Sequence, residues 1–417
     1  MTERYWIETL GCPKNRVDSD KLIGTLIADG LQAAGSPEEA DLVVVNTCAF
    51  IEAAREESIE AVLALSGARR NEASLVVTGC MAERYRDELV EALPEVDLVA
   101  PFGTSLRPAG QTGPGTPVSL GSKPSPPAPR LSLPSFDLLN LGRPPAAAPW
   151  SYVKVAEGCD RNCGFCAIPS FRGKQRSRTR ESILDEVEQL AGTEQELREV
   201  VLVAQDLASF GLDRAEGGAR RRLTDGRTTG RRTAGTRPIV ELVAAVAARV
   251  PWTRLLYLYP SALDQALVDA ILATGVPYFD LSLQHVSRPL VKRMRRWGDG
   301  DRFLDRIGSI RSSEPNAAFR SSFIIGYPGE TEADHDRLLE WIEEARLDWV
   351  GFFPFSKEYG TYASDLEGQV PAELVAERLR ECSERQDAVT ARRRDELIGA
   401  TVEVLVDAPG EGRTYRE

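Results

Sequence analysis

Short apolar runs alternate with helical patterns from the start of the chain, and this alternation limits the fold more than any other feature. Within residues 1–100, the runs at Trp6–Leu10, Leu42–Val45 and Leu75–Val77 have the length and apolar character of buried strands. Strands that alternate with helices form a parallel sheet covered by helices. We therefore expect an α/β domain over residues 1–100 with a doubly wound parallel sheet.

A cysteine follows each of these three runs, namely Cys12, Cys48 and Cys80. The carboxyl ends of parallel strands meet at one edge of a sheet, where open α/β sheets bind ligands. A single free cysteine is often only a small buried apolar residue, but three in equivalent positions favour one shared ligand. We predict that these thiols hold an iron-sulfur cluster.

The composition changes over residues 101–149, which hold twelve of the 26 prolines. Such a segment is typical of an extended linker. The alternation then resumes over residues 150–395, with strands predicted at 152–155, 200–203, 255–259, 278–283, 319–325 and 349–353. Six β-α repeats predict a partial (β/α)6 barrel, in which the chemistry lies on the loops after the strands.

The first loop of this second series carries Cys159, Cys163 and Cys166 in a CxxxCxxC pattern. Three thiolates so close together can bind three corners of a [4Fe-4S] cluster and leave the fourth iron open to a small chelating molecule. The alternative is a structural zinc site, which needs four protein ligands. With only two histidines in the chain, His285 and His335, a zinc site would need a distant cysteine. The spacing therefore favours the cluster.

Five residues are candidates for binding a small molecule beside this cluster, because of their positions around the predicted ring of loops: Phe165, Gln205, Ser322, Gly326 and Phe355. The structural alternative is that the glycine only makes a turn and the glutamine only caps a helix. The basic residues between Arg172 and Arg180 either neutralise the cluster or lie on a solvated surface. No pair of side chains suggests an acid-base catalyst, so we expect no catalytic residues beyond the cluster ligands.

Two segments do not fit the β-α series. Residues 213–237 form an Arg-rich, low-complexity insertion, for which we expect a surface location, with weak RNA contact as the alternative. Residues 396–417 start with a strand pattern at 401–405 and a turn around Gly410. Since so short a tail cannot form a β domain alone, we expect the start of a truncated C-terminal β-barrel.

Seven cysteines, an odd number in a chain of 417 residues, favour metal binding in a reducing compartment over disulfides. The N-terminus lacks the pattern of a secretory leader, and no apolar stretch is long enough to cross a membrane. A net charge of −12 disfavours a broad nucleic-acid interface and suits a basic protein partner. We expect a monomeric cytoplasmic protein with no membrane partner.

With these features in place, the chain resembles the radical S-adenosylmethionine (SAM) methylthiotransferases from Tyr5 to Glu417. LGCPKNRVDSD at 10–20 and NTCAFIEAAREES at 46–58 are similar to the RimO branch, which modifies ribosomal protein uS12. The tRNA-modifying MiaB branch typically has Gln-Met where this chain has Pro13-Lys14. The motifs around the second cysteine set, AEGCDRNCGFCAIPSFRGKQRSR, LSLQHVS and IIGYPGETE, are similar in both branches.

The resemblance implies two [4Fe-4S] clusters and SAM as cofactors, with an auxiliary cluster on Cys12, Cys48 and Cys80 and the radical SAM cluster on the CxxxCxxC cysteines. It implies that one SAM methylates a sulfur on the auxiliary cluster, and that another yields a 5′-deoxyadenosyl radical. The radical would activate the β-carbon of an aspartate in uS12. An external electron donor is also implied, and residues 396–417 would begin a TRAM domain.

Two alternatives stay open. The same chemistry could modify an adenosine of tRNA, as in the MiaB branch. Without catalysis, the chain would be a zinc-stabilised scaffold or an iron-sulfur electron carrier, but an electron carrier needs no ring of loops for SAM.

Overall fold

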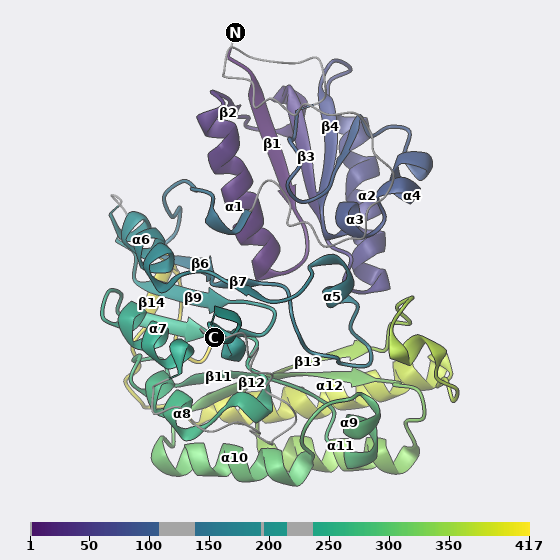
Figure 1. The fold of residues 1–417 in the computed structure, drawn as a ribbon. Coiled ribbons are helices and arrows are strands. Elements are labelled where there is room, and N and C mark those ends of the chain that lie inside the picture. The colour runs from purple at the N-terminus through teal and green to yellow at the C-terminus, as the bar shows by residue number, and fades with distance from the viewer. Residues whose placement is uncertain (1, 108–137, 193–195, 215–236) are drawn as a thin grey trace. The chain divides into compact units, whose positions relative to one another are not determined.

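The computed structural model describes residues 2–107, 138–192, 196–214 and 237–417, which belong to two compact units, Met1–Pro144 and Pro145–Glu417 (Figure 1). Most of the expected linker and of the Arg-rich insertion, at 108–137 and 215–236, lies outside the described residues. Within the described ranges, every helix is too short or too polar to cross a membrane.

The first unit contains a five-stranded parallel sheet in the order β2-β1-β3-β4-β5. Its strands are β1 (Arg4–Thr9), β2 (Gln32–Ala33), β3 (Leu42–Thr47), β4 (Ser74–Gly79) and β5 (Leu98–Ala100). The chain crosses from β1 to β2 on one side, and from β3 to β4 on the other. Because such crossovers are right-handed, this reversal places α1 (Pro13–Ala28) and α2 (Glu52–Ala68) on opposite faces. The prediction of a doubly wound sheet is confirmed, and the strand order reverses between β1 and β3.

The centre of this sheet is apolar on both faces. Every residue of β3 and β4 is buried, including the consecutive valines Val43, Val44 and Val45. β-branched side chains suit a strand that helices cover on both sides. Two further helices, α3 (Cys80–Arg84) and α4 (Arg86–Ala92), follow β4. The sheet is thus a rigid support for whatever residues follow its strands.

The second unit contains six parallel strands in two neighbouring sheets, in the orders β10-β9-β6 and β11-β12-β13. The strands are β6 (Trp150–Lys154), β9 (Glu199–Val203), β10 (Trp252–Leu255), β11 (Tyr278–Gln284), β12 (Ala318–Ile325) and β13 (Trp349–Pro354). A single parallel bridge between Leu258 and Leu281 joins the two sheets. The result is the predicted partial barrel, with a seam between β10 and β11.

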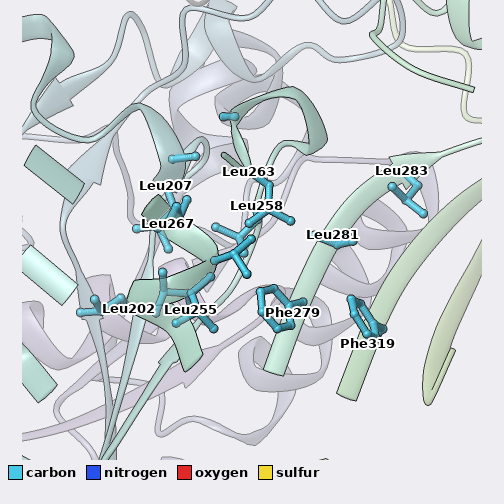
Figure 2. Packing of buried hydrophobic residues seen from close by; sticks show 14 of the residues in the cluster. Leu202, Leu207, Leu255, Leu258, Leu263, Leu267, Phe279, Leu281, Leu283 and Phe319 are labelled. Atoms are coloured by element: carbon cyan, nitrogen blue, oxygen red, sulfur yellow. The ribbon is translucent and has the colours of Figure 1, made fainter. Parts of the chain in front are cut away.

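Leucine and phenylalanine side chains fill the space between these strands and the surrounding helices (Figure 2). Leu202, Leu255 and Leu258 come from one side of the seam, and Phe279 and Phe319 from the other. The two phenylalanine rings stack with their centroids 5.3 Å apart. All five side chains are fully buried, so a continuous apolar core joins the two sheets although few backbone hydrogen bonds do.

Helices follow the barrel strands in regular alternation. The main helices are α6 (Arg180–Ala191), α7 (Pro238–Ala247), α8 (Gln265–Leu272), α9 (Arg288–Arg293), α10 (Gly300–Ser313), α11 (Glu332–Ala345) and α12 (Ala372–Asp395). Side-chain caps fix several of their starts: Thr179 accepts from the Ser182 amide, and Thr331 forms a reciprocal capping box with Asp334. These caps define where each loop at the carboxyl end of the barrel stops.

Two predicted strand positions are wrong. The third barrel strand is β10 at 252–255, not 255–259. Arg254 can lie within this buried strand because Glu199, at 2.7 Å, neutralises its charge. Beyond the strand, Tyr257 has a φ of +65°, which ends extended structure. In the tail, the strand is not 401–405 but β14 (Leu405–Ala408), which pairs antiparallel with β15 (Glu411–Arg413). The hairpin turn with Gly410 at φ +84° fixes this register.

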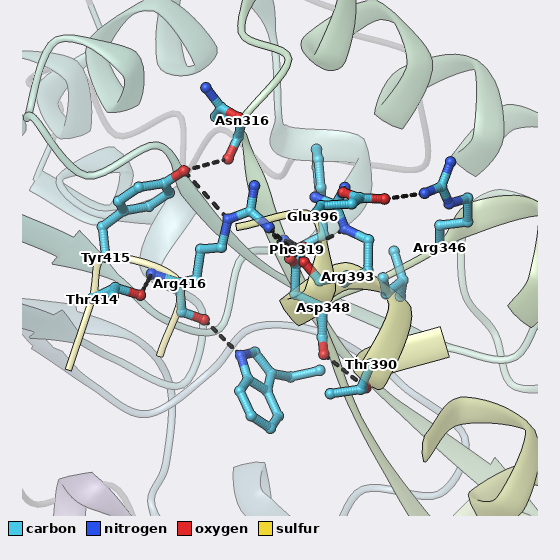
Figure 3. A network of polar contacts seen from close by, with 12 residues as sticks. Asn316, Phe319, Arg346, Asp348, Thr390, Arg393, Glu396, Thr414, Tyr415 and Arg416 are labelled. Atoms are coloured by element: carbon cyan, nitrogen blue, oxygen red, sulfur yellow. Dashed lines mark hydrogen bonds and ion pairs between the residues drawn. The ribbon is translucent and has the colours of Figure 1, made fainter. Parts of the chain in front are cut away.

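The tail continues to the amino end of the barrel strands (Figure 3). Arg416 lies 3.5 Å from Asp348, which precedes β13, and its carbonyl oxygen accepts a 2.6 Å hydrogen bond from the Trp349 indole. Arg413 forms a 2.5 Å ion pair with Glu199, the first residue of β9. The tail therefore packs against the end of the barrel opposite to the loops that follow the strands.

Candidate metal centres

The three cysteines of the first unit lie at the carboxyl ends of adjacent parallel strands. Cys12 precedes α1 after β1, Cys48 directly follows β3, and Cys80 directly follows β4. β1 and β3 flank the point where the strand order reverses, which is where open α/β sheets bind ligands. Cys48 and Cys80 are buried and Cys12 is half-buried.

Two glycines let the backbone approach closely here. Gly11 has a φ of +87°, and a Cβ atom on it would lie 2.7 Å from the Cβ and 2.9 Å from the Sγ of Cys48. Gly79, at φ +92°, leaves no room for a side chain beside Asn46. Any larger residue at either position would displace the cysteine-bearing loops.

Polar side chains that we did not predict tie the loop ends together. The amide nitrogen of Asn15 donates to the carbonyl oxygens of Leu10, at 3.0 Å, and Thr47, at 2.9 Å. Its oxygen lies 3.6 Å from the Sγ of Cys80. The hydroxyl of Ser58 accepts from the Cys48 amide at 3.1 Å. Asn15 thus contacts the ends of β1 and β3 and the thiol that follows β4.

The second cysteine set lies on the loop between β7 (Ala156–Glu157) and α5 (Ile168–Phe171). β7 pairs antiparallel with β8 (Arg176–Ser177), so the loop starts from a fixed pair of strands. Cys159 is buried, and Cys163 and Cys166 are half-buried. Gly158 has a φ of +77°, and a Cβ atom there would overlap the carbonyl oxygen of Lys174. Only glycine fits at this turn.

A buried carboxylate anchors the start of the loop. Glu157 accepts hydrogen bonds from Lys154 at 2.6 Å, Arg172 at 3.0 Å, Gln205 at 2.6 Å and the Gly158 amide at 3.2 Å. Burial raises the pKa of Glu157, but the charges of Arg172 and Lys154 outweigh burial and hold its pKa well below the usual range. Glu157 is therefore ionised and links the end of β6, the end of α5 and the loop after β9.

The first thiol of the loop is strongly desolvated. Burial, and secondly the charge of Asp206, raise the pKa of Cys159 to about 12. The Cys159 sulfur accepts from the Arg161 amide at 3.4 Å, and the Arg161 side chain pairs with Asp206 at 2.7 Å. A thiol with this pKa stays protonated at neutral pH unless a metal binds it, because metal binding deprotonates a coordinating thiol.

The five residues predicted to surround a small molecule are only partly brought together. Phe165 and Phe355 belong to one small cluster around Tyr327, whose ring meets Phe355 edge-on at 5.3 Å. Gln205 joins the network of Glu157 instead. Ser322 is half-buried within β12, opposite Gly351, and Gly326 follows β12 with a φ of +79°.

Glu330 supports the turn at Gly326. Its carboxylate accepts from the Gly326 amide at 2.6 Å and pairs with Arg378 at 3.0 Å. Burial raises the pKa of Glu330, although these hydrogen bonds and the charge of Arg378 oppose the rise. The motif GYPGE therefore builds a braced turn at the carboxyl end of β12, the position expected for it.

The basic residues near the loop are mostly not on a solvated surface. Arg172 and Arg178 are buried, and Arg178 pairs with Glu186. Cys382, the seventh cysteine, is fully buried in the main apolar core, where burial raises its pKa to about 12. Its position is that of a packing residue.

Both cysteine sets have the donor chemistry of an iron-sulfur cluster. Thiolates are the usual ligands of such clusters, and each binds a different iron, so they need not converge on one point. A zinc site does need such convergence. In the part of the chain that the structure describes, no three His, Cys, Asp or Glu side chains gather closely enough for a single metal ion.

Family comparisons match both units. Residues 4–101 match the model described as Uncharacterized protein family UPF0004, and residues 153–342 match the Radical SAM superfamily. The second match covers β9, β10, β11 and β12 completely. It covers the last two residues of β6 and ends before β13.

Curated relatives match nearly the whole chain. Ribosomal protein uS12 methylthiotransferase RimO of Moorella thermoacetica is 37% identical over 99% of this chain and 90% of its own length. The protein of the same name from Salinispora tropica is 40% identical over 98% of this chain and 84% of its own length. Among solved structures, the cobalamin-dependent radical SAM enzyme OxsB covers 93% of this chain and 56% of its own, at 11% identity and a TM-score of 0.47, which is too weak a likeness to add to the assignment. Because the curated relatives match almost the whole chain, the chain belongs to the RimO family of radical SAM methylthiotransferases.

Proposed function

We propose that this chain transfers a methylthio group to the β-carbon of an aspartate in ribosomal protein uS12. The observation that carries the proposal is the similarity, along almost the entire chain, to relatives named as uS12 methylthiotransferases. The aspartate β-carbon is the target that the motifs at 10–20 and 46–58 imply.

In this proposal, Cys159, Cys163 and Cys166 bind a [4Fe-4S] cluster whose fourth iron takes SAM, and Cys12, Cys48 and Cys80 bind an auxiliary cluster. The first cluster supplies the electron that cleaves SAM. Two separate sets of three cysteines, one after β1, β3 and β4 and one on the loop after β7, support the assignment of two clusters.

The protein's own residues position and shield these groups. The ionised Glu157 and its cationic partners fix the start of the cysteine loop, so that the three sulfurs keep one geometry. The apolar cluster of Phe165, Tyr327 and Phe355 excludes water beside the loop. Both effects suit radical chemistry, because the cofactor performs the reaction while the protein orients it and prevents side reactions.

For the SAM pocket we propose Phe165, Gln205, Ser322, Gly326 and Phe355. Gln205, Gly326 and Phe355 lie on the loops after β9, β12 and β13, and these positions support the proposal. Phe165 and Phe355 pack against the same small apolar cluster, which supports it further. The side-chain nitrogen of Gln205 donates to Glu157, and this hydrogen bond also fixes the direction of the side-chain oxygen of Gln205.

We further propose a domain division at 1–100, 101–149, 150–395 and 396–417, the last being the start of a TRAM domain. The partners are uS12 or the small ribosomal subunit and an external one-electron donor, and the enzyme acts as a cytoplasmic monomer. Free cysteine ligands support a reducing compartment, since oxidation to disulfides would prevent cluster binding.

The decisive experiment is an anaerobic reaction followed by mass spectrometry. Reconstituted protein receives SAM, sulfide and a low-potential reductant, together with uS12 and a tRNA that lacks the methylthio group. We expect the mass increase of a methylthio group on the uS12 aspartate, and none on the tRNA. Modification of tRNA alone would overturn the substrate, and binding that weakens steeply with salt would accompany it. Zinc in place of iron and sulfide would overturn the enzyme assignment.

A further inference from the structure

A short segment between α9 and α10 holds the CxxxCxxC loop from outside. The amide of Gly164 donates to the carbonyl oxygen of Met294 at 2.8 Å. The hydroxyl of Tyr327 donates to the carbonyl oxygen of Arg293 at 3.2 Å. A Cβ atom on Gly164 would lie 3.0 Å from the Tyr327 hydroxyl oxygen. We name residues Arg293–Trp297 the clasp, because backbone contacts fix them against the loop.

One side chain of the clasp reaches a cysteine sulfur. Nη1 of Arg296 lies 3.1 Å from the Sγ of Cys163, at hydrogen-bonding distance for sulfur. This is a contact across 133 residues of sequence, so it depends on the barrel being assembled. The guanidinium is a permanent positive charge, because arginine does not deprotonate in proteins.

The guanidinium is held in place by groups other than the thiol. Its Nη2 donates to the carbonyl oxygen of Ser282, within β11. Its plane lies over the Tyr259 ring, with 4.3 Å between Cζ and the ring centroid, and the Trp297 amide donates to the Tyr259 hydroxyl at 3.3 Å. Arg161 stacks on the same ring at 3.8 Å. The direction of the Arg296 group is therefore set before any metal binds.

A further donor of the same group is available. The Nε of Arg296 is buried and has no hydrogen-bond partner among the described residues. Leaving a buried N–H unpaired is costly, so such a donor points to an acceptor that belongs at the site. Sulfur acceptors of a bound cluster would supply one.

We propose that Arg296 sets the reduction potential of the cluster at Cys159, Cys163 and Cys166 by donating to the Cys163 thiolate. Reduction adds one negative charge to the cluster, and a fixed cation with an N–H donor at a ligand sulfur stabilises the more negative state. Hydrogen bonds to the sulfurs are one of the means by which proteins adjust such potentials. The proposal rests on the proposed function, because it needs that cluster to be present.

The test is a potentiometric titration of the reconstituted full-length protein, monitored by electron paramagnetic resonance. The signal that changes when SAM is added identifies the cluster with an open iron and separates it from the auxiliary one. In Arg296→Gln we expect the ratio of reduced to oxidised cluster at a fixed potential to fall about tenfold, which for one electron equals a midpoint about 59 mV lower. Arg296→Lys keeps the positive charge but loses the planar set of N–H donors, so the midpoint potential should fall less in this variant.

Arg295→Gln is the matched control. Arg295 is the neighbouring residue and carries the same charge, but it stacks on the Tyr362 ring at 3.7 Å instead of contacting a sulfur. The midpoint potential of the cluster in Arg295→Gln should stay close to that in the unchanged protein. An equal fall in both Gln variants, or no fall in Arg296→Gln at full iron content, would overturn the proposal. Failure of the unchanged protein to bind iron and sulfide would overturn the proposed function instead.

Discussion

Replacing Glu157 by Gln should destabilise the second unit strongly, because it removes the one anion among buried cations. The side chain of Lys154 is fully buried, and that of Arg172 is 4% exposed. Both donate to the same oxygen, at 2.6 and 3.0 Å. Removing one partner of a buried ion pair typically costs about 3–5 kcal/mol, since the remaining charge stays in the desolvated interior without the opposite charge that compensated it. We expect a loss of this size in the free energy of unfolding.

The assay is guanidinium unfolding of the metal-free protein followed by tryptophan fluorescence, since Trp150 and Trp252 lie on the two strands that flank β9. Glu196→Gln is the control: this carboxylate is 71% exposed and pairs with the half-exposed Arg198, so its loss should cost less than about 1 kcal/mol. If Glu157→Gln lost no more than this control, the carboxylate would not hold the loop, and the reasoning would be refuted.

The same carboxylate predicts a pH dependence. Since the pKa of Glu157 is depressed in the folded protein, it contributes stability that is complete above the unfolded pKa of about 4.3. This stability is lost as the pH falls below that value and through the folded pKa. Glu157→Gln should therefore flatten the acid limb of the stability curve, which unfolding experiments between about pH 3 and pH 6 would show.

Three further changes have defined outcomes. Gly11→Ala should lower bound iron to the level of Cys12→Ala, measured by iron analysis, because its Cβ would meet Cys48; unchanged iron would contradict this. His285 is fully buried, and burial lowers its pKa to about 4, so the unfolded chain binds the proton better and stability should fall by about 3 kcal/mol from pH 6.5 to 4. His285→Gln should lack that component of the pH slope in unfolding titrations. Asp348→Asn should cost about 3 kcal/mol in chemical unfolding, since it removes a buried anion beside Arg393 and Arg416, while iron content stays unchanged; the loss is that of the carboxylate which faces both cations, since Arg393 also pairs with Glu396.

The strand pattern could be predicted where local composition decides the structure. Valine runs such as Val43–Val45 have few alternatives to a central strand, and the strand ends then place Cys12, Cys48 and Cys80 at one edge. Prediction failed at β10, where Arg254 interrupts the apolar run and is neutralised by Glu199, a residue of another strand. Secondary structure of this kind depends on contacts that lie far apart in the sequence.

The same limit applies to the candidate metal centres. The CxxxCxxC cysteines could be found because their spacing is local, and Cys12, Cys48 and Cys80 because each follows a predicted strand. Asn15, Ser58 and Arg296 were missed, since their side-chain contacts with other segments appear only in the folded chain. The buried polar residue Asn46, directly before Thr47 and Cys48, was a usable signal: a polar side chain in a fully buried strand needs partners.

The tail at the amino end of the barrel gives the second unit one heavily fixed base. Glu199 pairs with Arg254 and Arg413, and Asp348 with Arg393 and Arg416, so that the starts of β9, β10 and β13 are linked by buried charges. The cysteine loop, which follows β6 and β7, and the turn at Gly326, which follows β12, lie at the carboxyl end of the barrel strands. Local opening near the cysteines can therefore occur without unfolding of the base. Amide hydrogen exchange would reveal this gradient as slow exchange at the strand starts and faster exchange toward the loops.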